Sequence, residues 1–227
     1  MAECSNQTNA ELKEFSYIIS HDLSASIRQL CCFSKLLADS MGGNLSEEQK
    51  QYLEFISQIS YKAERMLNAV THYSDIITKE FVSSKTELNQ VAKSAISQHK
   101  DLIKSCGGEV KCDILPTTVC DKILLTEVFY LLIDNALKFR SPDRLLEIHI
   151  GVEDLGDHKK IYVKDNGIGF DPKKTDIALS LFRSVEKNNS LGTGLAFAKK
   201  IIERHNGEVF LETKPDEGTK VSFTLQI

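Results

Sequence analysis

Apolar residues in the first part of the chain recur with the spacing of helices. Between residues 8 and 80 they fall three or four positions apart, or at sums of those spacings, in two series. The first series is Leu12, Phe15, Ile19, Leu23, Leu30, Phe33 and Leu37, and the second is Tyr52, Ile56, Ile59, Ala63, Met66, Val70, Tyr73 and Ile77. This spacing places each series on one helix face. The pattern therefore predicts two long helices, each with one apolar stripe.

The connection between the two predicted helices is short. Met41-Gly42-Gly43-Asn44 breaks the first helix, and Ser46 with Gln49 three residues later is a capping-box pattern that begins the second. Two helices joined in this way form an antiparallel hairpin, which alone buries only one stripe per helix. Because pairing two hairpins into a four-helix bundle buries far more, the sequence predicts a homodimer. We expect the dimerising hairpin to span residues 8–82.

From about residue 86 the pattern changes to short strand-like runs separated by turn signals. The strand-like runs are Glu109–Leu115, Leu145–Val152, Lys160–Lys164, Glu208–Glu212 and Lys220–Ile227. Helical patterns lie between them at about 88–105, 121–139 and 193–205. This order predicts an α/β sandwich with a mixed sheet over residues 86–227 rather than regular βαβ repeats. We expect the boundary between the two parts near Glu80–Lys85.

Composition narrows the class of protein. The chain has 227 residues, of which 41% are hydrophobic and 26% charged, which is typical of a soluble protein with room for two domains. No apolar run is long enough to span a membrane, and no signal peptide is visible. The net charge of −4 gives no basic footprint for nucleic acid. We expect the six cysteines to be reduced in a cytoplasmic protein, with redox sensing as the alternative.

One histidine on the first predicted helix has a position suited to chemistry. His21 lies roughly 200° around the helix from Ile19, the centre of the apolar stripe, so we expect it to face solvent. Phosphoryl transfer to histidine requires a neutral, accessible imidazole nitrogen as the nucleophile. The neighbouring Asp22 could accept the proton of the other ring nitrogen. An ordinary surface histidine is the alternative interpretation.

A second cluster, Asp134-Asn135-Ala136-Leu137-Lys138-Phe139, ends an apolar helical segment. Asn135 and Lys138 are three positions apart and therefore share a helix face. An asparagine oxygen suits Mg²⁺, which prefers oxygen ligands, and a lysine supplies a point charge for a phosphate. Phe139 could pack on a base. The alternative is a capped helix end with solvated basic residues.

Two clusters rich in glycine follow. Asp165-Asn166-Gly167-Ile168-Gly169-Phe170 comes directly after a predicted strand, where a buried Asp could accept a hydrogen bond from an exocyclic amino group such as that of adenine. Gly192-Thr193-Gly194-Leu195-Ala196-Phe197-Ala198 opens a helix, whose exposed N–H groups suit phosphate. The polar stretch Asp171–Leu191 between them is typical of a lid over a ligand. A strand-ending turn and a glycine-rich helix cap are the alternatives.

The order of the four clusters resembles the sequence boxes of sensor histidine kinases, over about residues 10–227. The resemblance implies a dimeric helical domain followed by an ATP-binding domain of the GHKL superfamily. It further implies that His21 is the phosphoacceptor and Asp22 its acid/base neighbour. By the same resemblance, Asn135 would hold Mg²⁺, Lys138 would contact phosphate and Phe139 would line the adenine site.

The resemblance also implies roles for the two glycine-rich clusters. Asp165 would read the adenine amino group, with Gly167 and Gly169 shaping the pocket, and Phe182 would anchor the lid. The residues implied to bind the phosphates of ATP are Gly192, Thr193, Gly194 and Leu195. The implied reaction is transfer of the γ-phosphoryl group of Mg-ATP to His21 and then to an aspartate of a response-regulator receiver domain. No Walker-type GxxxxGK[ST] motif occurs.

Several positions depart from the pattern of this family. They are Ala25, Ser26, Leu131, Ala196 and Phe197, where the family usually has Thr or Asn, Pro, Asn, Gly and Leu respectively. The departures leave open a phosphotransfer or scaffold protein with a degenerate ATP-binding domain. A GHKL ATPase of another class, such as an anti-sigma kinase or a chaperone-type clamp, has no need of the exposed histidine. Because no sensor domain is visible, we expect an upstream sensor domain or protein.

Overall fold

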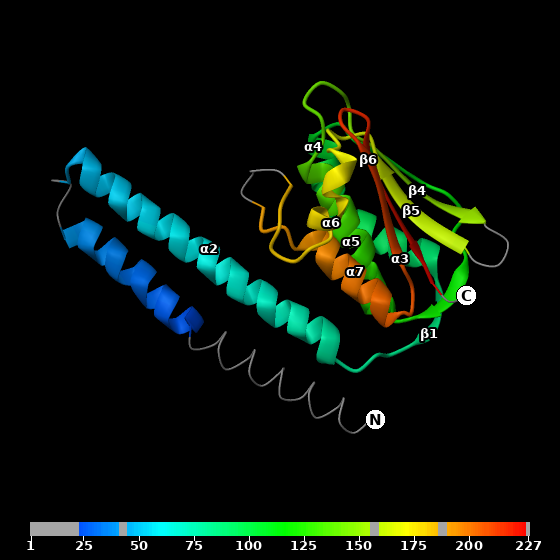
Figure 1. Ribbon diagram of the computed structural model, residues 1–227, viewed down its shortest axis with the longest axis horizontal. Coiled ribbons are helices and arrows are strands. Elements are labelled where there is room, and N and C mark those ends of the chain that lie inside the picture. The colour runs from blue at the N-terminus through cyan, green and yellow to red at the C-terminus, as the bar shows by residue number, and fades with distance from the viewer. Residues whose placement is uncertain (1–22, 41–44, 155–158, 186–189, 226–227) are drawn as a thin grey trace. The chain divides into compact units, whose positions relative to one another are not determined.

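The computed structural model describes residues 23–40, 45–154, 159–185 and 190–225 (Figure 1). The chain divides into two compact units, Met1–Lys79 and Glu80–Ile227. His21 and Asp22, the predicted phosphoacceptor and its neighbour, lie outside the described residues, as does the predicted helix break at 41–44. No helix in the described part of the chain is long and apolar enough to cross a membrane.

The described part of the first unit consists of two helical segments. Residues 23–40 are helical, and α2 runs from Glu47 to Thr78. The start of α2 is fixed by a capping box, because the Ser46 hydroxyl accepts from the Gln49 N–H at 3.2 Å and the Gln49 side chain accepts from the Ser46 N–H at 2.8 Å. The predicted start of the second helix is therefore confirmed.

The apolar stripes of the first unit are largely exposed within a single chain. Phe33 and Ile59 are 66% and 67% exposed. Other exposed members of the two stripes are Leu23, Leu30, Leu37, Tyr52, Ile56 and Met66. Small side chains, including Ser34, Ser60 and Ala69, are among those that are buried. A single chain thus leaves a row of large apolar side chains on each helix in contact with water.

The second unit is an α/β sandwich. Its helices are α3 (Leu88–Gln98), α4 (Lys100–Ser105), α5 (Lys122–Lys138), the 3₁₀ turn η1 (Pro172–Lys174), α6 (Thr175–Ala178) and α7 (Gly194–Arg204). Its strands are β1 (Ser84–Glu87), β2 (Glu109–Cys112), β3 (Thr117–Cys120), β4 (Glu147–Asp154), β5 (Lys159–Asp165), β6 (Val209–Lys214) and β7 (Gly218–Thr224).

The main sheet is mixed, as the sequence predicts. Its strand order is β2-β4-β5-β7-β6, with β2 parallel to β4 and the other neighbours antiparallel. Strands β1 and β3, which the sequence pattern does not predict, pair with each other in a separate two-stranded sheet.

Helix α5 packs between α3 and α7, and these helices lie on one side of the sheet (Figure 1). It is apolar over most of its surface, which is the pattern of a helix buried on several sides. Phe129 of α5 meets Phe223 of β7 edge to face, with ring centroids 5.8 Å apart. Asp121 caps the start of α5 by accepting from the N–H groups of Ile123 and Leu124. This packing brings the C-terminal end of α5 beside the end of β5.

Candidate functional site

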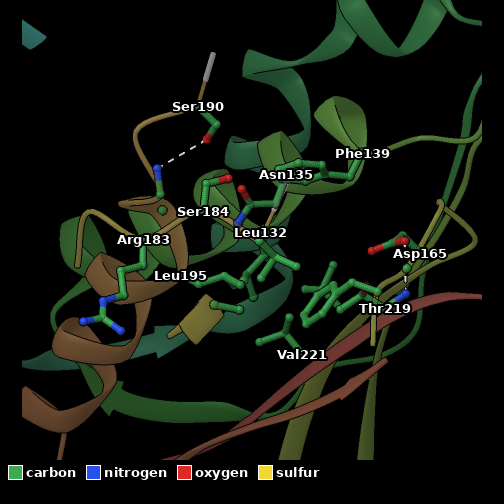
Figure 2. Close-up of a pocket in the computed structure, with 17 residues that line it drawn as sticks. Leu132, Asn135, Phe139, Asp165, Arg183, Ser184, Ser190, Leu195, Thr219 and Val221 are labelled. Carbon is green, nitrogen blue, oxygen red and sulfur yellow. Dashed lines mark hydrogen bonds between the residues drawn. The ribbon is translucent and has the colours of Figure 1, made fainter. Parts of the chain in front are cut away.

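A pocket lies between the end of α5, the sheet and the segment that leads into α7 (Figure 2). The predicted site residues that line it are Asn135, Phe139, Asp165, Gly169, Gly192, Gly194 and Leu195. Five further lining residues belong to the stretch Asp171–Leu191 that the sequence predicts as a lid: Ala178, Arg183, Ser184, Val185 and Ser190. The lining residues that sequence reasoning missed are Leu132, Val163, Phe170, Thr219 and Val221. The structure therefore gathers residues from all three predicted clusters of the second unit around one cavity.

The floor of the pocket is apolar and comes from the sheet. Val163 of β5 and Val221 of β7 are directly paired in the antiparallel ladder, so both side chains project to the same face. Leu132 of α5 and the rings of Phe139 and Phe170 add to the lining. A surface made of aliphatic and aromatic side chains suits a flat, uncharged ring.

Asp165 ends β5 and places a carboxylate on the wall of the pocket. Its Oδ1 accepts a hydrogen bond from the N–H of Gly167 at 2.8 Å. The same atom accepts another from the N–H of Thr219 at 3.2 Å (Figure 2). Both bonds use the same oxygen, which leaves Oδ2 available to a ligand. Burial raises the pKa of Asp165 above its usual range, while the two N–H groups and the charge of Arg144 oppose this rise.

The loop after Asp165 passes so close to its neighbours that two positions accept only glycine. A Cβ on Gly167 would collide with the carbonyl oxygen of Phe139, and one on Gly169 would collide with that of Lys214. Gly169 also has a φ of 55°, in the left-handed region that favours glycine. The N–H of Ile168 donates to the Phe139 oxygen at 2.9 Å. Gly167 thus shapes the pocket without lining it.

The opposite end of the pocket is formed by Asn135 and the start of α7. The Nδ2 atom of Asn135 is buried and has no hydrogen-bond partner among the described residues. A Cβ on Gly194 would lie 3.3 Å from both amide atoms of Asn135, so the side chain faces the first turn of α7. No side chain caps that helix start, and its N–H groups remain available to an anion. A buried amide group beside them points to a polar ligand.

The remaining predicted residues lie near the pocket without lining it. Lys138 forms an ion pair with Asp134 at 2.5 Å, so its predicted contact with phosphate stays a prediction. Thr193 is the N-cap of α7. Phe182 has a φ of 61°, which is uncommon for a residue with a side chain. The next residue, Arg183, lies in the predicted lid; its backbone carbonyl lies against Gly192, and its exposed guanidinium points away from Asn135 (Figure 2).

Comparison with known proteins agrees with this geometry. Residues 120–227 match the family described as histidine kinase-, DNA gyrase B-, and HSP90-like ATPase. Cyanobacterial phytochrome A from Nostoc sp. is 32% identical over 224 residues, which are 97% of this chain and 29% of that protein. The methanogenesis regulatory histidine kinase FilI of Methanothrix harundinacea is 27% identical over 219 residues, which are 96% of this chain and 25% of FilI.

A solved structure shows the same fold. Full-length ShkA in complex with AMPPNP gives a TM-score of 0.67 at 17% sequence identity, covering 93% of this chain and 45% of that one. The present chain spans less than a third of the length of the curated relatives named above. Its second unit has the fold of the GHKL ATPases. The chain belongs to the sensor histidine kinases, of which it represents the catalytic core.

Proposed function

We propose that this chain phosphorylates its own His21 from Mg-ATP and passes the phosphoryl group to an aspartate of a response regulator. The observation that carries the proposal is the two-ended pocket. One end offers the free Oδ2 of Asp165 above an apolar floor, and the other offers the unpartnered Nδ2 of Asn135 beside the uncapped start of α7. Adenine and a chain of phosphates have matching chemistry at their two ends.

The adenine end would recognise the base by one polar contact and by stacking. The 6-amino group of adenine donates to Oδ2 of Asp165, while Val163, Val221 and Phe139 cover the ring. Guanine carries an oxygen at the same position, which a carboxylate would repel. This end therefore favours ATP over GTP.

The phosphate end would hold negative charge by backbone and side-chain donors. The N–H groups of the first turn of α7 and the unpartnered Nδ2 of Asn135 would face the phosphates. Asn135 fits Mg²⁺, since its amide oxygen is a hard ligand in the lining beside that helix start. When bound, Mg²⁺ neutralises charge that develops on the phosphates. By binding the metal ion, Asn135 would hold the phosphates close to the start of α7.

His21 would act as the nucleophile. One imidazole nitrogen forms a bond to the γ-phosphorus of ATP as the bond to the β–γ bridging oxygen breaks, and ADP leaves. The ring attacks in its neutral form, and Asp22 accepts the proton of the other ring nitrogen as the phosphorus–nitrogen bond forms, so that neutral phosphohistidine results. In the onward step the phosphoryl group moves from the imidazole to a carboxylate oxygen of the receiver.

The exposed stripes of the first unit support a homodimer. Side chains such as Phe33 and Ile59 would be removed from water if two hairpins formed a four-helix bundle. Each buried residue of this size contributes about 1.5–3 kcal/mol, so a row of them is ample to hold two chains together. A sensor domain or sensor protein upstream of this dimer would supply the stimulus.

Two of the departures from the family pattern lie outside the lining of the pocket. Neither Leu131 nor Ala196 lines the pocket, and Ala196 is buried in the packing of α7. The Cβ of Ala196 therefore occupies space in the core of the second unit rather than in the nucleotide pocket. This placement favours an active kinase over a phosphotransfer protein with a degenerate ATP-binding domain.

Binding measurements on the full chain test the proposal. Isothermal titration calorimetry should show one nucleotide site per chain, with ATP bound more tightly than GTP and more tightly with Mg²⁺ than with EDTA. Failure of the folded chain to bind ATP or ADP at millimolar concentration would exclude this function for the pocket.

A further inference from the structure

Arg144 connects two loops that meet at the adenine end of the pocket. It lies in the segment between α5 and β4. Its Nε donates to the carbonyl oxygen of Asn166 at 2.6 Å, and its Nη2 donates to those of Gly167 and Asp216, each at 2.7 Å. A guanidinium is planar, permanently charged and carries five N–H donors, so it can hold several carbonyls in a fixed arrangement.

Two of these carbonyls belong to the loop that follows Asp165. Asn166 ties the same loop to the segment that carries Arg144, because its Nδ2 donates to the Leu145 oxygen at 2.9 Å and its Oδ1 accepts from the Glu147 N–H at 2.9 Å. The side chains of Arg144 and Asn166 thus brace this loop against the chain between α5 and β4.

The third carbonyl belongs to the turn between β6 and β7. Asp216 in this turn has a φ of 62°, and its N–H donates to the Ile168 oxygen at 2.7 Å. A Cβ on Gly218 would collide with the carbonyl oxygen of Asp165. Since Thr219 donates its N–H to Asp165, the turn and the loop together set the direction of that carboxylate. Arg144 bonds to carbonyls of both segments. Thr213 is a second bridge, because its Oγ1 accepts from the Phe170 N–H and donates to the Gly218 oxygen.

The contacts of Arg144 should affect the position of the two loops more than the stability of the second unit. The side chain is exposed, so water can replace the guanidinium at carbonyl groups that it leaves. The buried helices α5 and α7 do not depend on it. What the guanidinium adds is preorganisation, because a loop already held in its binding conformation loses less entropy when a ligand arrives.

We propose that Arg144 is a positioning residue for base recognition: by joining the 165–169 loop to the β6–β7 turn, it aims the carboxylate of Asp165 at the exocyclic amino group of adenine. This inference rests on the function proposed above. Lysine should not replace Arg144, since one ammonium nitrogen cannot reproduce the fixed separation of Nε and Nη2, which together bond to three carbonyls.

Comparison of two nucleotides in the full chain tests the inference. ATP is compared with purine riboside triphosphate, which lacks the 6-amino group. Arg144→Gln and Arg144→Lys should each weaken ATP binding about tenfold and change binding of the analogue by less than about twofold. Arg204→Gln removes an arginine at the far end of α7 and is the matched control, for which we expect both affinities to stay unchanged.

Hydrogen exchange gives a second measurement that needs no ligand. In Arg144→Gln the amides of Ile168 and Asp216 should exchange faster, while those in the middle of α5 keep their protection. If the ratio of the two nucleotide affinities is the same in both Arg144 variants as in the wild type, whether or not both affinities fall, the inference is overturned. A wild-type chain that binds the two nucleotides equally would instead contradict adenine recognition by Asp165 and thus the proposed function.

Discussion

The two units of this chain differ in how completely they bury their own apolar residues. In the second unit, α5 is enclosed by α3, α7 and the sheet, and side chains such as Phe129 and Ile133 are fully buried. In the first unit, residues of comparable size such as Phe33 and Ile59 remain exposed. The second unit therefore forms its pocket within one chain, whereas the first unit leaves its apolar stripes exposed, which is the basis of the proposed dimer.

This difference separates assembly from nucleotide binding. A substitution on the stripes of the first unit should act on the dimer, and one in the pocket should act on the nucleotide. Additivity of distant sites is the usual behaviour when they share no contacts. The following changes test whether the two properties separate as the structure indicates.

The largest effect is expected from Ile59→Glu. In a bundle this change places an unpaired carboxylate in each half of an apolar interface, which costs several kcal/mol per ion. We expect the dimer dissociation constant to rise by at least about 100-fold, as measured by analytical ultracentrifugation, with ATP affinity unchanged. Asn68→Glu is the control, because Asn68 is exposed and lies about 180° around the helix from Ile59. Retention of the dimer in Ile59→Glu would contradict the predicted interface.

Asn135→Ala should have the opposite effect: it should weaken nucleotide binding and leave the dimer unchanged. The variant loses the amide that faces the start of α7, and the affinity for Mg-ATP should fall about 10- to 100-fold, the worth of one hydrogen bond to a charged group. Calorimetry with and without Mg²⁺ measures the loss, which should be larger with the metal. Sedimentation should show an unchanged dimer. Equal losses with Mg²⁺ and with EDTA would argue against Asn135 as a metal ligand.

The smallest effect is a dependence of stability on pH that belongs to the second unit. His205 is buried, its Nδ1 lies 2.8 Å from the Ile201 oxygen, and its Nε2 accepts from the Asp121 N–H at 3.1 Å. Both contacts suit the neutral ring. Burial lowers the pKa of His205 below its usual range, so the unfolded state binds the proton more readily.

The sign of the pH effect follows from this shift. The stability that neutral His205 provides is fully present above the unfolded pKa of about 6.5 and is lost as pH falls toward the folded pKa. Urea unfolding at pH 7.5 and pH 5.5 should therefore show a smaller loss in His205→Gln than in the wild type. The difference between the two proteins removes contributions from other groups such as Asp165. Parallel losses in both proteins would contradict the assignment to His205.

Much of the fold follows from local sequence signals. The capping box at Ser46 starts α2 as predicted, and all five predicted strands occur in the main sheet, although their ends differ. For example, the run predicted as Glu109–Leu115 ends at Cys112. Strands β1 and β3 escape prediction because neither lies in a longer run with an apolar pattern, and Ser84–Glu87 is entirely polar. Such short strands are defined by their pairing with each other rather than by their own pattern.

The candidate site is less fully encoded in local patterns. Asn135, Asp165 and the glycines stand out because their residue types mark ligands and tight turns. Val163 and Val221 line the pocket only because β5 and β7 pair in one particular register, which no single strand reveals. Thr219 contributes a backbone N–H, and Arg144 bonds to carbonyl groups, so neither leaves a signal in the sequence.

The central claim is that ATP bound in the pocket of the second unit is the phosphoryl donor for His21 of the first unit. The direct measurement is to incubate the full chain with Mg²⁺ and γ-labelled ATP and to map the label. Because a phosphorus–nitrogen bond is labile to acid and stable to base, we expect a label with these properties on the peptide that contains His21. His21→Gln should take up no such label while binding ATP as tightly as the wild type. Acid-labile label on the His21→Gln protein, or acid-stable label on the wild type, would contradict the account.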